Sequence, residues 1–281
     1  LLRFENNKED LFFMVKNDDL YISLMNELTK NKYFKKKLIK DDSFYNNFQK
    51  KYDLIINCNS NNFLSRKFFS KKIYKNYNNL AYTTILKHKY IKNDVATQIF
   101  TKSGPIAFLP ISNSETSLVF SSDNKKKKYN EKEILNLIST YNPKYQIQKI
   151  LKLSSFKLSL SNLRNYYYQN ILAFGDLLHK IHPLAGQGFN MSIRDIKQLS
   201  KLIDKKIDIG LDIDSSIFFE FQKNLKDKNF IFSTGIDWVY ELFNFESKIN
   251  TKIISKSINI IGKNKSINYF FKKFADLGLR I

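Results

Sequence analysis

One stretch of this 281-residue chain, residues 170–202, constrains the fold most, because it concentrates residue types that are scarce elsewhere. The chain has eight Gly, three His and four Pro, and this stretch holds three of the glycines, two of the histidines and one proline. Its apolar run 171–174 is typical of a buried parallel strand. The run ends at Gly175-Asp176. A carboxylate should therefore emerge at the carboxyl edge of a sheet, where ligands bind in open α/β folds.

The residues that follow predict a glycine loop that opens into a helix. From Met191 onward, apolar residues recur at helical spacing, which predicts a helix that starts near Asn190. Before it, Gly186-Gln187-Gly188 permits positive φ angles and close approach of a ligand, since glycine has no Cβ. The free N–H groups of the helix start favour an anionic or electron-rich ligand group.

The same glycine loop is compatible with two further roles. In the simpler one, it only turns the strand into the helix. In the second, it is a dinucleotide-binding G-x-G-x-x-G/A loop, which is disfavoured because Met191 stands where that pattern needs a small residue.

Residues 175–199, GDLLHKIHPLAGQGFNMSIRDIKQL, closely resemble a known motif. It is the second flavin-binding motif, G-D-A-A-H-x-x-H-P-x-x-G-Q-G-x-N-x-x-x-x-D, of the para-hydroxybenzoate-hydroxylase-like flavin monooxygenases, nearest to the ubiquinone-biosynthesis hydroxylases. The resemblance implies that Asp176 binds the ribityl chain of FAD and that the loop from Pro183 to Asn190 lies against the isoalloxazine ring. The cofactor-binding residues that it implies are Gly175, Asp176, Pro183, Ala185, Gly186, Gln187, Gly188, Phe189 and Asn190.

A second match to this family follows a strand-like run, YDLIIN at 52–57. The family has a similar strand followed by A-D-G-x-x-S-x-x-R, whose Asp and Gly serve flavin and pyridine-nucleotide binding. Asn59 and Ser60 occupy those two positions, whereas Arg66 matches the arginine and joins the implied cofactor-binding residues. An Asn amide can still hydrogen-bond a phosphate or ribose. A surface arginine in a salt bridge is the simpler interpretation of Arg66.

Strand-like segments separated by turn signals predict an antiparallel sheet. The segments are 80–90, 96–102, 106–111 and 116–122. GPIAFLPIS at 104–112 resembles the G-P-x-A-x-L-P-L of the family's substrate-binding sheet, which implies that one face covers a flat aromatic substrate against the flavin. Taken singly, Phe100, Phe108 and Phe120 are expected to fill a core, and His88 to be an ordinary sheet histidine.

Apolar periodicity predicts helices around this sheet. The helical regions are the part of 10–28 that follows the cap-like Asn17-Asp18, then 131–141, 215–245 and the stretch from 253 to the end. A core position is expected for the apolar residues Leu20, Ile22, Leu24, Met25 and Leu28. Residues 156–168 are expected to form a link, with the tyrosines 166–168 packed at a domain seam. Asp237 lies in a segment that resembles the family's T-D-x-L-x-x-L-F.

The expected fold class is α/β: an incomplete FAD-binding Rossmann-like domain with an antiparallel substrate-binding sheet and C-terminal helices. The expected domains are 1–72 (remainder of the FAD-binding domain), 73–165 (substrate-binding sheet) and 166–281 (second part of the FAD-binding domain and C-terminal helices). The family's G-x-G-x-x-G loop for the FAD pyrophosphate has no match in these residues, and the first residue is Leu1 rather than Met. We therefore expect that part of the domain to lie upstream.

Composition limits the partners. Lys and Arg number 47 against 26 Asp and Glu, a formal net charge of +21 at pH 7. Such a surplus attracts an anionic membrane surface or nucleic acid, although a general bias towards Lys, Asn and Ile is the simpler cause. We expect no nucleic-acid partner.

The chain has a single cysteine, Cys58, which excludes an internal disulfide. No cluster of Cys and His has zinc spacing, so no metal site is predicted.

The resemblance implies an FAD-dependent monooxygenase that hydroxylates an aromatic ring of a polyprenylated ubiquinone precursor, with NAD(P)H and dioxygen. In such enzymes the cofactor carries the chemistry, so no catalytic side chain is predicted, and His179 and His182 are expected to shape the loop. A polyprenyl tail implies a cytoplasmic protein peripheral to the inner membrane, with an anionic membrane surface and other ubiquinone-biosynthesis proteins as partners. The alternative is a non-catalytic remnant that serves as scaffold or lipid-binding partner in a quinone-biosynthesis assembly. Asn59 and Ser60 favour that alternative, and the intact segment around Asp176 opposes it.

Overall fold

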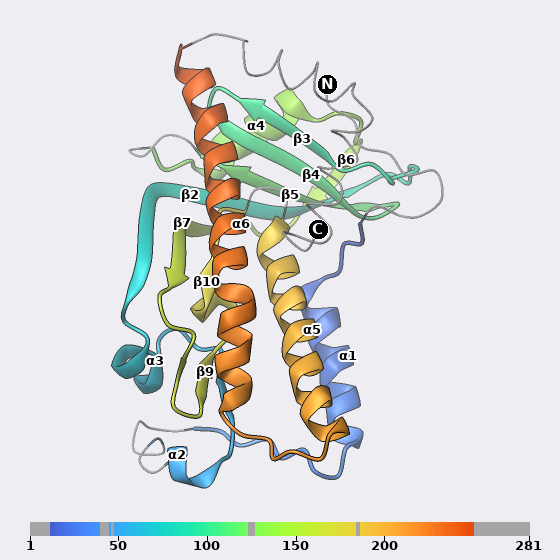
Figure 1. The fold of residues 1–281 in the computed structure, drawn as a ribbon. Coiled ribbons are helices and arrows are strands. Elements are labelled where there is room, and N and C mark those ends of the chain that lie inside the picture. The colour runs from blue at the N-terminus through green and yellow to red at the C-terminus, as the bar shows by residue number, and fades with distance from the viewer. Residues whose placement is uncertain (1–11, 40–44, 46–47, 123–126, 184–185, 250–281) are drawn as a thin grey trace, which may run out of the picture.

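The computed structural model describes residues 12–39, 45, 48–122, 127–183 and 186–249. Figure 1 shows two sheets joined along one side by two long helices, α5 (Gln187–Asp208) and α6 (Ser216–Ile249). The fold is mixed α/β with a large antiparallel sheet, which confirms the predicted fold class. The predicted domain boundaries stay a prediction.

The small sheet has the strand order β1-β9-β8. β1 (Ile55–Asn57) pairs in parallel with β9 (Ile171–Ala173), and β8 (Tyr167–Tyr168) pairs with β9 in antiparallel. Parallel pairing brings together segments more than a hundred residues apart and sets their carboxyl ends at one edge. All three β9 residues are fully buried, as an apolar run in a parallel strand requires. The predicted parallel strand and its buried position are confirmed.

The large sheet has the order β10-β7-β2-β5-β4-β3, and β6 also pairs with β2. Its strands, all antiparallel, are β2 (Lys72–His88), β3 (Thr97–Thr101), β4 (Gly104–Ser112), β5 (Glu115–Ser121), β6 (Ile147–Ile150), β7 (Ser154–Leu163) and β10 (His179–Lys180). α4 (Glu131–Tyr141) covers one face through Ile134 and Ile138, which join the core of this sheet. Its start is fixed by a capping box between Asn130 and Glu133.

The long helices tie the two sheets together. The first turns of α6 lie in the core of the small sheet, where Phe218 and Phe221 are fully buried. Further along, Tyr240 of the same helix packs on β2 and β7 of the large sheet. The shorter elements are α1 (Asn17–Lys30), α2 (Phe48–Lys51), α3 (Phe63–Phe68) and the 3-10 turn η2 (Gly175–Leu177).

Several local predictions are confirmed. The helices at 131–141 and 215–245 form, and the strands between 80 and 121 form in the predicted antiparallel order. Phe108 and Phe120 are fully buried. His88 is a buried sheet residue whose two ring nitrogens have partners, the Lys89 carbonyl and the Thr116 hydroxyl.

Other local predictions are wrong. Residues 154–163 form strand β7 rather than a link, and its alternating Phe156, Leu158 and Leu160 already carried a strand period. Phe100 is 41% exposed, because β3 is the edge strand of the large sheet. The helix predicted from residue 253 onward lies outside the described residues.

The helix at 17–30 forms as predicted, yet the prediction that its apolar residues belong to a core is wrong. α1 has no buried residue, and Ile22, Leu24 and Leu28 are 56%, 55% and 45% exposed. Periodicity fixes which side of a helix is apolar, whereas burial depends on another element covering that side. Within the residues that the structure describes, no element covers this side of α1.

Of the helices that the structure describes, none is both long and apolar enough to cross a lipid bilayer.

Candidate functional site

The candidate site begins where β9 ends. Gly175 has a φ of +61°, a left-handed conformation that favours glycine, and turns the chain out of the strand into η2. Asp176 follows in η2 with an exposed side chain. Across the same sheet edge, the Phe174 amide donates to the Asn57 carbonyl at 2.9 Å, which joins the ends of β9 and β1. The carboxylate thus stands at the carboxyl edge of the parallel pair, as the sequence indicated.

The glycine loop meets the helix earlier than predicted. Gly186 has a φ of +66° and is the N-cap, so α5 starts at Gln187, three residues before Asn190. Gly188 lies inside the first turn and has no positive φ, so only Gly186 needs glycine for its backbone angle. A Cβ on Gly186 would meet no atom within 4 Å. Among the described residues, no side chain caps α5, so the first-turn N–H groups stay available to a ligand.

A buried hydrogen-bond network holds this loop between strand and helix. His179 of β10 and Asp195 of α5 are almost fully buried, and the His179 Nε2 lies 2.6 Å from an Asp195 carboxylate oxygen. The other carboxylate oxygen accepts from the Asn229 amide of α6 at 3.1 Å. Three elements therefore meet at one carboxylate, and this contact fixes both ends of the loop.

Polar atoms without partners gather around the same loop. Among the described residues, the buried side-chain atoms that lack a hydrogen-bond partner are Asn79 Oδ1, His179 Nδ1, both ring nitrogens of His182 and Gln187 Oε1. Most buried polar groups in proteins have partners, and each exception needs a physical reason. Here three of the four residues fall within 179–187. Buried polar atoms of this kind are completed by a polar ligand or by ordered water.

Arg66 lies on an element apart from the other predicted cofactor-binding residues that the structure describes (Figure 1). Gly175, Asp176, Pro183, Gly186, Gln187, Gly188, Phe189 and Asn190 line the strand edge, the loop and the first turn of α5. Ala185 lies outside the described residues. Arg66 sits on α3, exposed, and one guanidinium nitrogen donates to the Asn61 carbonyl. Figure 1 shows α3 and the first turn of α5 well apart.

The turn that carries Asn59 and Ser60 is closed by its own hydrogen bonds. Asn59 accepts from the Asn61 amide at 2.8 Å, and Asn57 exchanges side-chain hydrogen bonds with Asn62. The Asn57 amide also donates to the Ser65 hydroxyl at 2.8 Å. The carboxamide oxygen of Asn59 thus serves the local turn.

A neighbouring aromatic cluster was missed by the sequence analysis. His182 stacks on Tyr240 with ring centroids 4.0 Å apart and meets Tyr77 edge-on at 5.3 Å. The Tyr77 hydroxyl donates to Asp237, which also accepts from the Lys75 ammonium group. Burial lowers the pKa of His182 to about 4, so its imidazole is neutral at pH 7. The tyrosines come from β2 and α6, and no local sequence pattern indicates that the two side chains pack together.

Comparison with known proteins finds a matching domain model and relatives of low identity. An FAD-binding domain model matches residues 80–208. The ubiquinone biosynthesis monooxygenase COQ6 of Dictyostelium discoideum is 27% identical over 183 residues, which cover 52% of this chain and 37% of that protein. The chain is thus similar, at low identity, to FAD-binding proteins and to enzymes of ubiquinone biosynthesis. The 3-demethoxyubiquinol 3-hydroxylase of Escherichia coli is 28% identical over 156 residues, covering 53% of this chain and 40% of that protein.

Solved structures agree on the fold. The p-nitrophenol 4-monooxygenase PnpA of Pseudomonas putida superposes with a TM-score of 0.62 at 11% identity, covering 81% of this chain and 60% of that one. The aromatic hydroxylase CabE gives a TM-score of 0.56 at 10% identity, covering 79% and 46%. The matches to the COQ6 proteins of Dictyostelium and Drosophila melanogaster span between about a third and a half of those proteins' length.

FAD fits the residues that form this site. Asp176 is an exposed carboxylate at a strand end, suited to the hydroxyl groups of a ribityl chain. The uncapped start of α5 presents N–H donors, and Gly186 leaves open space where a larger residue would place its Cβ. Gln187 adds a buried oxygen without a partner. Together these groups would hold the ribityl chain and the polar edge of the flavin.

Proposed function

We propose that this chain forms the flavin-loop and substrate-sheet part of an FAD-dependent monooxygenase that hydroxylates an aromatic ring of a polyprenylated ubiquinone precursor, with NAD(P)H as reductant and dioxygen as oxidant. The observation that carries the proposal is the segment 179–187, in which three described residues have buried polar atoms without partners and which leads into the uncapped start of α5. The names of two relatives, a ubiquinone biosynthesis monooxygenase and a 3-demethoxyubiquinol 3-hydroxylase, support the same chemistry.

The residues of this chain would act by position rather than by acid or base catalysis. FAD, when bound, supplies the redox chemistry. Asp176 would fix the ribityl chain, and the first-turn amides of α5 would stabilise negative charge on the pyrimidine edge. The His179–Asp195–Asn229 network would keep the loop from moving, since its three members come from three elements. The large sheet, with its apolar residues, would exclude water from the ring that reacts.

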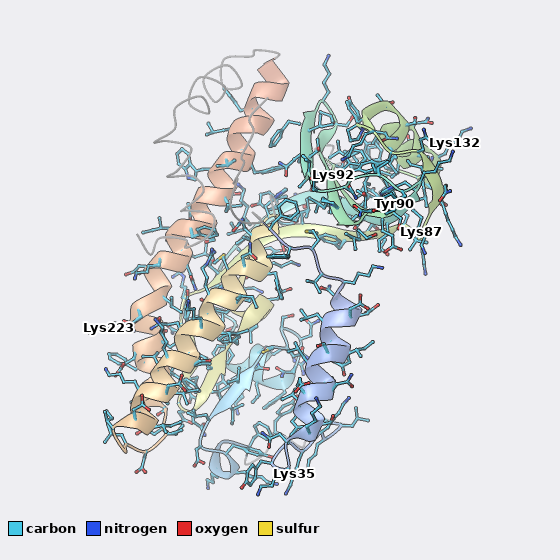
Figure 2. All side chains as sticks on the ribbon, turned by 90° about the vertical axis from the view of Figure 1, so that its right-hand side faces the viewer. Lys35, Lys87, Tyr90, Lys92, Lys132 and Lys223 are labelled. Carbon is cyan, nitrogen blue, oxygen red and sulfur yellow. The ribbon has the colours of Figure 1, made fainter. Side chains whose placement is uncertain are left out.

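The proposed substrate implies that the enzyme works at a membrane surface. A polyprenyl tail stays in the bilayer, so the enzyme would dock peripherally to the inner membrane, and other ubiquinone-biosynthesis proteins would be its partners. Figure 2 shows basic residues on several elements, with Lys87, Lys92 and Lys132 around the large sheet, Lys35 near α1 and Lys223 on α6. The lysines labelled in Figure 2 thus lie on several parts of the described structure rather than in one patch. Spread charge fits a long-range attraction to an anionic surface as well as a compositional bias.

The experiment that tests the proposal is the flavin content of Asp176→Ala, read from the visible absorbance of the purified protein. A hydrogen bond to a charged group is worth about 1.5–3 kcal/mol, so FAD affinity should fall roughly tenfold to a hundredfold. Asp204→Ala is the matched control, because Asp204 is an exposed aspartate further along α5. Stoichiometric FAD in Asp176→Ala would remove Asp176 from the site.

The same measurement decides the second candidate, a non-catalytic remnant. Asn59 and Ser60 favour it, because they stand where the family pattern has Asp and Gly. The side-chain oxygen of Asn59 accepts a hydrogen bond within its own turn. A remnant without flavin would be purified colourless and would gain no visible spectrum when FAD is added. Bound FAD that NAD(P)H reduces would exclude that candidate.

A further inference from the structure

The neutral imidazole of His182 is held in place without using either of its nitrogens. Tyr240 covers one ring face at 4.0 Å, and Tyr77 approaches the ring edge-on at 5.3 Å. The side chain is 1% exposed, and both ring nitrogens lack a partner among the described residues. A neutral imidazole carries one N–H donor and one acceptor nitrogen. The ring of His182 therefore holds one donor and one acceptor in a fixed orientation.

The two tyrosine hydroxyl groups have other partners. Tyr77 donates to Asp237, which Lys75 also contacts at 2.9 Å. The Tyr240 hydroxyl accepts from the Asn79 amide at 2.9 Å, and the Asn79 oxygen is itself buried without a partner in the described part of the chain. The tyrosines therefore orient the imidazole through their rings, while other groups hold their hydroxyls.

An irregularity in β2 lies within this arrangement. The pairing of β2 with β7 shifts between Asn76 and Leu80, and Asn78 has a φ of +56°. Asn is among the few residues that tolerate this left-handed conformation. Tyr77 and Asn79, two residues apart on the same face of β2, are both buried there, and bulges of this kind often re-aim side chains beside binding sites.

The place of His182 in the chain indicates the ligand. His182 directly precedes Pro183, the first residue of the loop proposed to face the flavin ring, and its cluster lies where α6 packs on β2 and β7. Figure 1 shows α6 passing over these strands. Resting on the function proposed above, we propose that His182 contacts the substrate: its imidazole hydrogen-bonds a ring oxygen, a phenol or carbonyl, of the aromatic head group. Asn79 Oδ1 extends the same polar edge.

Replacement by an apolar residue should affect the melting temperature differently for His182 and for a histidine whose nitrogens have hydrogen-bond partners in the protein. Phenylalanine keeps the aromatic contacts and removes the two polar atoms without partners, so His182→Phe should fold with unchanged or higher melting temperature. His88→Phe is the matched control, because His88 is equally buried and has partners at both nitrogens. His88→Phe should melt lower and keep its ligand preference, whereas His182→Phe should keep its stability and lose that preference.

The test measures binding of a short-chain alkylphenol and of its methyl ether to the FAD-loaded protein by titration calorimetry. We expect the unsubstituted protein to bind the phenol roughly three to ten times more tightly than the ether, the value of one neutral hydrogen bond. His182→Phe should bind both equally, and His182→Gln, which keeps a donor and an acceptor, should retain part of the preference. If His182→Phe fails to fold, His182→Leu takes its place.

The results that overturn the inference are specific. An unchanged preference in the apolar variants, or no preference in the unsubstituted protein, means that His182 does not contact the ring oxygen and that a buried water meets its nitrogens. Those results would leave FAD content untouched, so they are separate from a failure of the proposed function, which would appear as absence of flavin whatever residue stands at 182.

Discussion

The carboxylate of Asp195 is fully buried and is the point at which β10, α5 and α6 meet, so its removal should unfold more than one element. Asp195→Ala would leave the His179 Nε2 and the Asn229 amide without this acceptor. An unsatisfied buried polar group costs about 1–3 kcal/mol, and this substitution leaves two such groups. We expect Asp195→Ala to lower the free energy of unfolding by about 4 kcal/mol.

The assay is urea unfolding followed by far-UV circular dichroism, with two comparisons. Asp204→Ala, an exposed position on the same helix, should change the free energy of unfolding by less than about 0.5 kcal/mol. In a cycle of Asp195→Ala with His179→Ala, the coupling energy should exceed about 1 kcal/mol, because the two side chains share one hydrogen bond. A cost for Asp195→Ala within about 1 kcal/mol of the Asp204→Ala value would refute the idea that this network holds the loop.

Two further predictions concern pH and salt. The pKa of His182 is lowered from 6.5 to about 4 in the folded protein. Between these two pH values the unfolded chain therefore binds one proton more than the folded chain. The stability that His182 contributes is complete above about pH 6.5 and falls by up to about 3 kcal/mol as the pH falls towards 4. His182→Phe should flatten the fall of unfolding free energy between pH 6.5 and 4, and an unaltered slope would contradict the burial argument. Co-sedimentation with liposomes that contain anionic lipid should be strong at low salt and weak at high salt, since each Lys or Arg near the surface contributes about 1 kcal/mol within a Debye length. Equal binding to neutral liposomes would leave the +21 charge without a role at membranes.

Local chemistry in the sequence determined the elements of the candidate site. A run of apolar residues predicts β9, Gly175 and Gly186 take the left-handed angles that their residue type permits, and helical spacing predicts α5. Strand period, turn residues and caps act over a few residues, so they are visible in one stretch of chain. The same local rules placed the helix start three residues late, since Gly188 is compatible with both a loop and a first helical turn.

Tertiary structure alone decided which of these elements meet. The sequence predicted an apolar stripe on α1 but could not show that no described element covers it. It contained Tyr77, His182 and Tyr240 without any sign that they pack together, because they lie far apart in the chain, on β2, on a loop and on α6. Burial and the loss of hydrogen-bond partners are properties of the assembled layers, not of any segment. The polar atoms without partners around His182 and Gln187 therefore appear only when the sheets and long helices are in place.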